Sequence, residues 1–411
     1  MRKHSLILNK VHWIQVLASP RAGAALLGCA IFFTYAVLPL VLGSINSGAD
    51  SSYFILAALA TFAVASLAMG ASISLFDSWF SGRQRRVTIG MYGFNTCLWG
   101  VFVFFVFFAW WTAPKIPLLA ALTGADSATV AVLREQFLKA REGWQASFVY
   151  VNAILSGALI PYSLALMFVN QTRRRWFAAS LFLLYSLSFM EKAYFLKALL
   201  PLFVLAAQGR VRIGISPKML FVVALGVVLA MTFISGAGSS EGTTDVSFFS
   251  VDYLPGGVID HIAWRLFAIP LLTALDAVKL FENYFDGHFL LGGTSSFISG
   301  VFGIEHVEFE RLVYSFQWGQ NETGTGSANS VFITEAFVNF GWAGVFVFGL
   351  IVGLLMRLFA RSQDKAFQAL WPLFALGLYS AGLIGLLLSN GFVLLFFVIL
   401  FFRIRPYSLY R

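Results

Sequence analysis

The sequence predicts an all-helical protein that crosses a membrane many times, and three observations lead to this fold class. Of the 411 residues, 59% are hydrophobic and only 11% are charged. A soluble protein has roughly a quarter of its residues charged, which this chain does not supply. Apolar runs long enough to cross a bilayer, about 20 residues each, recur along the whole length. A soluble enzyme is therefore excluded, and residues 1–411 are interpreted as a single integral membrane domain.

Six apolar runs are predicted to be full spans, at residues 22–44, 52–76, 89–111, 147–170, 219–236 and 331–356. The first follows a basic start, as a signal peptide would, but it is too long for a signal's apolar core, so we expect it to be retained. Two further apolar blocks, 177–208 and 366–402, are interpreted as pairs of shorter helices that turn at "MEKAYFLK" and at "SNG" (389–391). We expect about ten membrane segments, within a range of roughly eight to twelve, some of them short or re-entrant.

The basic residues predict which segments lie in the cytoplasm. Short connecting segments and the two ends hold 19 of the 28 Lys and Arg residues, and the positive-inside rule places such segments, with both termini, on the cytoplasmic side. The longer segments 112–146 and 237–330 are then expected to face outward. Cys29 and Cys97 fall inside apolar runs and are interpreted as free thiols packed as small hydrophobes.

The outward segment 112–146 contains a predicted amphipathic helix, "ATVAVLREQFLKAREGW". Leu133 and Phe137 lie on its apolar stripe, and Arg134, Lys139 and Arg141 surround that stripe. Two interpretations stay open: a cationic grip on a phosphate group, or a helix in the headgroup region anchored by its basic side chains.

The outward segment 237–330 is interpreted as a large, partly helical loop. Within it, the stretch 261–285 has apolar positions at mixed spacing, scattered charges and Pro270, which suits a surface-lying or partly inserted helix better than a span. His261 and Arg265 lie four residues apart, on one helical face. A histidine can act as a base near neutral pH, and an arginine matches the geometry of a phosphate. No spacing of His, Asp and Glu predicts a metal site.

Ionisable residues inside membrane segments are candidates for function, because burying them is costly. Glu191 and Lys192 lie at the predicted tip of the short hairpin, followed by Lys197. They form either a polar site at the membrane surface, where a lipid-linked substrate would present its head, or a mutual ion pair that plugs the break between two helices.

The stretch "SANSVFITEAFVNFGWAG" (327–344) places Glu335 and Asn339 four residues apart near the start of a predicted span. The preceding segment is rich in glycine, and the positive end of the helix dipole would face outward. The two side chains either line a cavity for a lipid headgroup or hydrogen-bond neighbouring helices and hold the bundle together.

Four stretches together resemble the Wzy-type polymerases of O-antigen and exopolysaccharide repeat units: "LREQFLKAREG", "MEKAYFLKALLPLF", "HIAWRLFAIP" with the following "LLGGTSSFISGVFG", and "GSANSVFITEAFVNFGWAGVFVFGLIVG". The last is the most specific, since N-x-x-x-x-x-E-x-x-x-N-F-G-x-x-G leads into an apolar helix. The resemblance spans residues 112–356. It implies a metal-independent, multi-spanning glycosyltransferase of the polyprenyl-phosphate-dependent, GT-C-like kind, without a cofactor, at the outer face of the bacterial inner membrane.

That resemblance implies transfer of a growing glycan from undecaprenyl pyrophosphate onto an incoming lipid-linked repeat unit. Without a metal, arginines must stabilise the departing pyrophosphate, and the outward candidates are Arg134, Arg141, Arg265 and Arg311. The candidate bases are Glu191, His261 and Glu335. The residues expected to line the substrate are Lys192, Lys197, Asn329, Asn339 and Trp264.

The expected partners are the lipid-linked oligosaccharide, the bilayer and, from the family, a chain-length regulator and a flippase; no nucleic-acid partner is expected. Two alternatives remain at this point. An O-antigen ligase would use the same donor but transfer the glycan to lipid A core. A lipid-linked oligosaccharide flippase would move its substrate without covalent change; such transporters usually show internal repeats, and none is apparent.

Overall fold

The computed structural model is mainly helical and describes residues 14–45, 50–75, 77, 87–190, 192–211, 246–319, 326–328 and 331–405, with a few isolated positions between 219 and 229. The N-terminal half contains α2 (Pro20–Phe32), η1 (Phe33–Val37), α3 (Leu38–Ile45), α4 (Ser51–Ser72), α6 (Met91–Trp111), α7 (Pro117–Leu122), α8 (Ser127–Leu138), η2 (Gly143–Ala146), α9 (Ser147–Ile154), η3 (Leu155–Leu159), α10 (Ile160–Val169), α11 (Arg175–Ser188) and α12 (Lys192–Ala207). The C-terminal half contains α14 (Val258–Ala263), η4 (Trp264–Ala268), α15 (Ile269–Tyr284), α16 (Ser296–Phe302), α17 (Phe309–Trp318), α18 (Phe332–Arg361), α19 (Lys365–Gln368), α20 (Trp371–Ser380), α21 (Leu383–Leu388) and α22 (Phe392–Phe401).

Six helical segments of the described chain are long and apolar enough to cross a membrane: Pro20–Ile45, Ser51–Ser72, Met91–Trp111, Gly143–Val169, Val258–Tyr284 and Phe332–Arg361. Five of them coincide with predicted spans, which confirms the polytopic fold class. The predicted span 219–236 lies outside the described residues apart from isolated positions. The expected total of about ten segments is not confirmed by these six.

The two ambiguous apolar blocks do form short helices. Block 177–208 is a hairpin of α11 and α12, as predicted, and its turn includes Met190 in a left-handed conformation (φ 55°). Block 366–402 turns at residues 389–391, as predicted, where Gly391 has φ 76°. It also breaks at Ala381 and Gly382, between α20 and α21. That second break was not predicted, because nothing local in the sequence distinguishes it from a continuous apolar helix.

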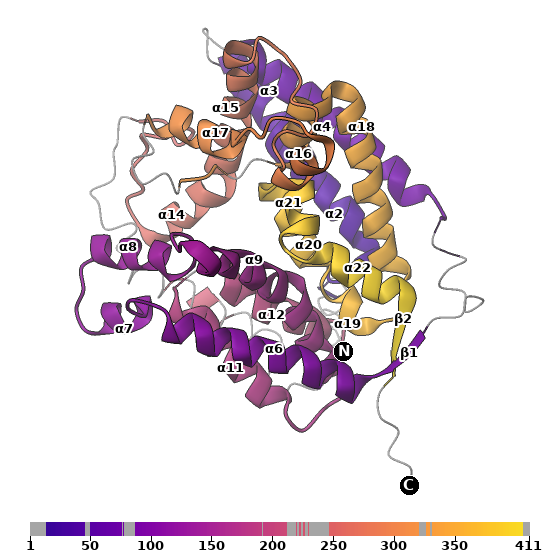
Figure 1. Ribbon diagram of the computed structural model, residues 1–411. Helices are drawn as coiled ribbons and strands as arrows, with labels where there is room; N and C mark the ends of the chain where they lie inside the picture. The colour runs from indigo at the N-terminus through magenta and orange to yellow at the C-terminus, as the bar shows by residue number, and fades with distance from the viewer. Residues whose placement is uncertain are drawn as a thin grey trace, which may run out of the picture.

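Helices α4 and α18 form the most extensive helix pair and run parallel, side by side (Figure 1). Small residues let the two backbones approach: a Cβ on Gly349 would lie 1.9 Å from the Ser66 hydroxyl, and one on Gly353 would lie 2.1 Å from the Leu67 carbonyl oxygen. This small-xxx-small contact is typical of membrane helices. Because the helices are parallel, both begin at the same side of the membrane, as the predicted topology requires.

Segments that were predicted to be cytoplasmic contact one another at one end of the bundle. Strand β1 (Val87–Gly90) pairs in parallel with β2 (Phe402–Arg405), with Val87 opposite Phe402 and Gly90 opposite Arg405. These short strands are an addition to the predicted all-helical fold. At the same end, Arg357 forms an ion pair with Asp77 (2.6 Å). The contacts therefore agree with the charge-based grouping of these segments.

The segment Val258–Tyr284 has the length of a span, yet its charged half contacts the first turn of α4. Lys279 forms an ion pair with Asp50 (3.1 Å), and the Ser51 hydroxyl lies 3.4 Å from a Glu282 oxygen. The α14–η4–α15 segment is inclined to α4 and α18 (Figure 1). The interpretation of 261–285 as a surface-lying helix therefore stays a prediction.

Cys29 and Cys97 are free, as predicted, but both are exposed rather than packed. Each lies on a helix that is long and apolar enough to be a span. An outward-facing thiol on such a helix contacts lipid, so the physical reason for the difference is that the apolar environment of these two residues is the bilayer and not the protein core.

Candidate functional site

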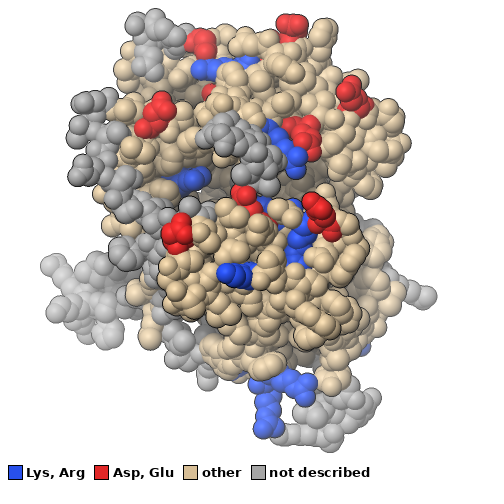
Figure 2. All heavy atoms as spheres, turned by 60° about the vertical axis from the view of Figure 1, so that its left-hand side comes forward, with Lys and Arg blue, Asp and Glu red and all other residues tan. Residues whose placement is uncertain are grey.

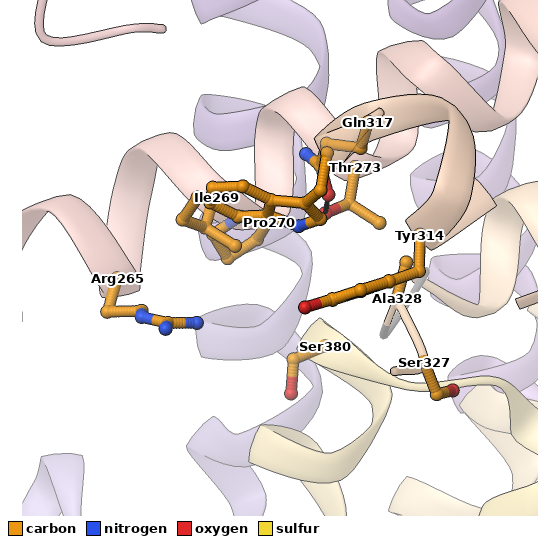
Figure 3. A pocket seen from close by; sticks show the side chains of 10 residues that line it. Arg265, Ile269, Pro270, Thr273, Tyr314, Gln317, Ser327, Ala328 and Ser380 are labelled. Atoms are coloured by element: carbon orange, nitrogen blue, oxygen red, sulfur yellow. Dashed lines mark hydrogen bonds between the residues drawn. The ribbon is translucent and has the colours of Figure 1, made fainter. Parts of the chain in front are cut away.

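A cavity of about 500 Å³ lies where η4, α15, α17 and the end of α20 meet (Figure 3). Its wall combines one cation, several hydroxyl and amide groups, two aromatic rings and a few apolar side chains. The lining residues are Arg265, Ile269, Pro270, Thr273, Tyr314, Gln317, Trp318, Ser327, Ala328 and Ser380. A space-filling view shows the molecule hollowed between an upper and a lower part, with acidic and basic side chains gathered around the hollow (Figure 2).

Pro270 explains how this part of the chain is attached to α20. Proline has no backbone N–H, so the carbonyl four residues earlier, on Leu266, loses its helical partner. The Tyr379 hydroxyl takes that position and lies 3.1 Å from the Leu266 oxygen. The turn Trp264–Ala268 is a π-helix, a widened turn that is frequent at functional sites. The attachment holds Arg265, on this turn, beside the end of α20.

Arg265 is an exposed cation that points into the cavity (Figure 3). Within the described residues its guanidinium has no ion pair or hydrogen bond, and it lies 5.7 Å from the centre of the Trp264 ring. The Tyr314 hydroxyl faces it across the cavity (Figure 3). Trp264 is buried behind it and donates from its indole N–H to the Ser250 carbonyl oxygen (3.2 Å). The backbone of Arg265 is therefore held in place, and its guanidinium group is available to a ligand.

Glu335 forms a hydrogen bond at the break between α20 and α21, in the C-terminal apolar block. One of its carboxylate oxygens accepts from the backbone N–H of Ile384 (3.2 Å), in the first turn of α21. A carboxylate is favoured there because the first N–H groups of a helix lack partners. Gly382 makes room for it, since a Cβ at that position would lie 2.7 Å from the Glu335 carboxyl carbon. Glu335 thus stabilises the α20–α21 break, next to Ser380 in the cavity wall.

Asn339 is fully buried and anchors the loop that precedes α16. Its side-chain oxygen accepts from the Gly292 N–H (2.9 Å), and its amide nitrogen donates to the Thr294 hydroxyl and to the Glu335 carbonyl oxygen (both 2.8 Å). Two turns into α18, Gly341 departs from helical geometry (φ 63°, ψ −152°). The structure therefore uses Asn339 to hold elements together, and it does not line the cavity.

Glu310 is a site residue that the sequence did not single out. Its carboxylate accepts from the Ser327 hydroxyl (2.9 Å), and its backbone carbonyl accepts from the Ala328 N–H (3.0 Å). Ser327 and Ala328 both line the cavity. Part of Glu310 is open to solvent, but the surrounding protein raises the pKa of its carboxyl through desolvation. In "EHVEFERL" nothing distinguishes Glu310 from the neighbouring acids.

The other predicted arginines lie outside the cavity lining. Arg141 is 8% exposed and donates to the carbonyl oxygens of Phe137 (2.6 Å) and Ala109 (2.9 Å), and burial lowers its pKa. Arg311 is exposed and pairs with Glu308 (2.8 Å). Arg134, on α8, has a buried Nε without a described partner. Arg141 therefore joins the end of α8 to the end of α6 in this structure.

The remaining predicted residues are placed as follows. His261 lies in α14, with its ring 6.3 Å from that of Trp264. Lys197 lies in α12, with its Nζ 4.0 Å from the centre of the Tyr194 ring. Glu191 and Asn329 lie outside the described residues, as does the side chain of Lys192. The structure therefore tests no joint site at the tip of the α11–α12 hairpin.

No group of three or more His, Cys, Asp and Glu residues that could hold a metal ion occurs among the described residues. The cation that the site offers to an anionic ligand is Arg265. An arginine presents several N–H donors in a planar fork that suits phosphate oxygens. The aromatic rings of Tyr314 and Trp318 add flat apolar surfaces to the same wall.

The fold and this site define a multi-pass helical membrane protein with a polar, arginine-containing cavity. Residues 194–381 match the family model of the O-antigen polysaccharide polymerase Wzy, so the resemblance seen in the sequence is confirmed. Every residue that lines the cavity falls within the matched segment. Neither the curated proteins nor the solved structures give a match. At the level of the family, the match supports an O-antigen polymerase that uses a lipid-linked oligosaccharide in a membrane.

Proposed function

We propose that this protein polymerises oligosaccharide repeat units carried on undecaprenyl pyrophosphate, and that the cavity beside Arg265 is where the glycan is transferred. A hydroxyl of the incoming repeat unit attacks the anomeric carbon of the growing glycan. The bond from that carbon to the pyrophosphate oxygen breaks, undecaprenyl pyrophosphate leaves, and a base takes the hydroxyl proton. The observation that carries the proposal is an arginine that has no partner within the described part of the chain, in a cavity whose lining lies wholly inside the segment matched by the polymerase family.

Arg265 supplies the positive charge that the leaving group needs. Preorganised donors aimed at developing charge stabilise a transition state strongly in a site sheltered from water. The Tyr314 hydroxyl, which faces Arg265 across the cavity (Figure 3), is a neutral donor for the same phosphate oxygens. Arg141 and Arg311 are already engaged with protein oxygens, and Arg134 lies outside the cavity lining, so Arg265 is our choice among the outward arginines.

A carboxylate near the cavity supplies the base. Glu335 already accepts from the first turn of α21, which suits a positioning role. Glu310 accepts from Ser327 in the cavity wall, and desolvation raises its pKa, which makes the carboxylate a stronger base. We therefore assign the role of the base to Glu310. Among the bases predicted from the sequence, His261 is the alternative. The site faces the periplasm in this proposal, and a flippase and a chain-length regulator act before and alongside it.

The test is polymerisation in vitro by the purified full-length protein, with undecaprenyl pyrophosphate-linked oligosaccharide as substrate and EDTA present. A ladder of products is expected without added metal. Arg265→Ala should reduce the rate about 10²–10³-fold, the usual effect of removing one transition-state donor. Arg311→Ala is the matched control, because that arginine is exposed and outside the cavity lining, and it should keep most of the activity.

Three results would contradict the proposal. Equal losses in Arg265→Ala and Arg311→Ala would show that the cavity is not the reaction site. Transfer that occurs only after lipid A core is added would identify an O-antigen ligase. Movement of the intact lipid-linked oligosaccharide across the membrane, without covalent change, would identify a transporter.

A further inference from the structure

The loop between α15 and α18 exposes several apolar side chains. Along residues 289–302 the exposed ones are Phe289 (48%), Leu291 (59%), Phe297 (61%), Val301 (63%) and Phe302 (72%). Patches of this kind on a protein surface mark contacts with another molecule or with a membrane. The next residues, Glu305 and His306, are exposed and polar, so the apolar set has a sharp polar edge.

The N–H groups of residues 290–295 are all hydrogen-bonded, although this stretch has no regular structure. The N–H groups of Leu290 and Leu291 donate to the carbonyl oxygens of Val338 and Asn339 (both 3.0 Å). These carbonyls are free because α18 leaves helical geometry at Gly341. The following N–H groups also have acceptors: Gly292 and Thr294 donate to the Asn339 side chain, Gly293 to Leu290, and Ser295 to Gly292. Irregular backbone near hydrocarbon requires such complete pairing, whereas a loop in water does not.

The bonds to α18 also fix the depth of the loop. Gly341, against which Phe289 packs, lies 16 residues before Arg357, which is about 24 Å along a helix and most of the roughly 30 Å thickness of the hydrocarbon core. Arg357 forms the ion pair with Asp77 beyond the end of α4, so it marks one boundary with water. Gly341 and the loop that packs beside it then lie close to the opposite boundary. The parallel register that sets Gly353 beside Leu67 places Gly341 level with the second turn of α4, which gives a similar depth.

We propose that residues 289–302 form a membrane-interface loop, whose apolar side chains insert between lipid headgroups and acyl chains at the end of the bundle where α18 begins. The occupant of the apolar surface is the bilayer, because Phe289 connects through the ring of Phe337 to Trp342 of α18 and Phe62 of α4. Both of these rings are exposed on the adjacent spans. Helix α16 lies in the plane of the interface, with its apolar face toward lipid and Glu305 toward water. An apolar face at this depth is the mark of interfacial helices. The proposal does not depend on the enzymatic activity or on which side of the membrane is periplasmic.

The test places single spin labels in full-length protein in which Cys29 and Cys97 are replaced by alanine. The protein is reconstituted in vesicles of phosphatidylethanolamine and phosphatidylglycerol. Phe297→Cys and Phe302→Cys should be several-fold more accessible to oxygen, which concentrates in lipid, than to a water-soluble nickel chelate. Glu305→Cys, three residues beyond α16 and exposed, is the matched control and should show the reverse preference.

Equal access of the nickel chelate to positions 297, 302 and 305 would overturn the proposal. So would shielding of 297 and 302 from both reagents, because that would mean that a protein surface covers them. Phe302 is the most exposed of the five, so its replacement is the least disruptive to folding. If Phe297→Cys does not fold, Phe302→Cys and Val301→Cys decide the question.

Discussion

Replacing Gly341 with alanine tests whether the break in α18 is built into the backbone. Gly341 has φ 63° and ψ −152°, a region that residues with a side chain avoid, at a cost of about 1–3 kcal/mol. A Cβ there would also lie 2.8 Å from Cζ of Phe289. Forcing a side chain into a packed site costs about 1–3 kcal/mol, and the lower part of that range applies because Phe289 is half exposed and can move. We therefore expect Gly341→Ala to lower the free energy of unfolding by about 2–4 kcal/mol.

The two contributions can be separated by a double-mutant cycle. Phe289→Ala removes the atom that the new Cβ would meet but leaves the backbone strain. The double variant Gly341→Ala/Phe289→Ala should therefore recover only the part of the lost stability that comes from the contact. Gly300→Ala is the control, because it lies in α16 with open space around its Cβ position. A glycine replaced by alanine at a compatible site stabilises by about 0.4–1 kcal/mol.

The assay is unfolding of the purified protein in a denaturing detergent, followed by circular dichroism of the helices. If Gly341→Ala unfolds at the same detergent fraction as the parent protein, α18 tolerates a side chain there and the break is not enforced by the backbone. If Phe289→Ala restores full stability, only the contact matters, and the strain argument is refuted.

Three further outcomes are expected. Gly353→Leu should prevent α4 and α18 from approaching, because even a Cβ would lie 2.1 Å from the Leu67 carbonyl oxygen; cross-linking of cysteines placed on the two helices should fall. Asn339→Ala should destabilise by about 1–3 kcal/mol, the cost of a buried N–H left without its acceptor, measured in the same unfolding assay; an unchanged stability would show that water replaces the side chain. The hydrogen bond from Arg357 lowers the pKa of Asp77, so this pair stabilises the fold above the ordinary carboxyl pKa and loses its effect as pH falls through the lowered value. The stability difference between the parent protein and Asp77→Asn should therefore vanish at strongly acidic pH, and a difference that persists there would refute the ion-pair account.

Local composition was enough to predict most of the spans and none of the breaks that shape the site. Length and hydropathy located α4, α6 and α18, and the "SNG" turn and the α11–α12 hairpin followed from turn residues and from the short length of the blocks. The break at Ala381 and Gly382 depends on a carboxylate 47 residues earlier in the chain, on Glu335. No local pattern contains that information, because the partner of an open backbone N–H is set by packing.

The candidate arginines show that the sequence was also insufficient to predict which cation binds the substrate. The sequence could state that Arg265 and Arg141 were outward-facing cations, and both fitted a phosphate equally well. The structure separates them because Arg141 faces carbonyl oxygens at the end of α6, while Arg265 lies next to Pro270, on a turn attached to α20 through Tyr379. Glu310 was missed for the converse reason: its sequence neighbours are equally acidic, and only its contact with Ser327 connects it to the cavity.

Polar residues in a membrane helix are commonly interpreted as functional because they are costly to bury, and α18 shows how that cost is offset without chemistry. Glu335 satisfies the open start of α21, and Asn339 satisfies the loop that α18 would otherwise leave unpaired. Each polar side chain therefore accompanies a break in a neighbouring backbone, and together with Gly341 they account for most of the "E-x-x-x-N-F-G" pattern. A charge that satisfies no backbone group and faces a cavity needs another explanation. Arg265 is such a charge among the described residues, and for this reason we expect the chemistry of the protein to depend on Arg265 and on the attachment of its turn to α20 through Tyr379.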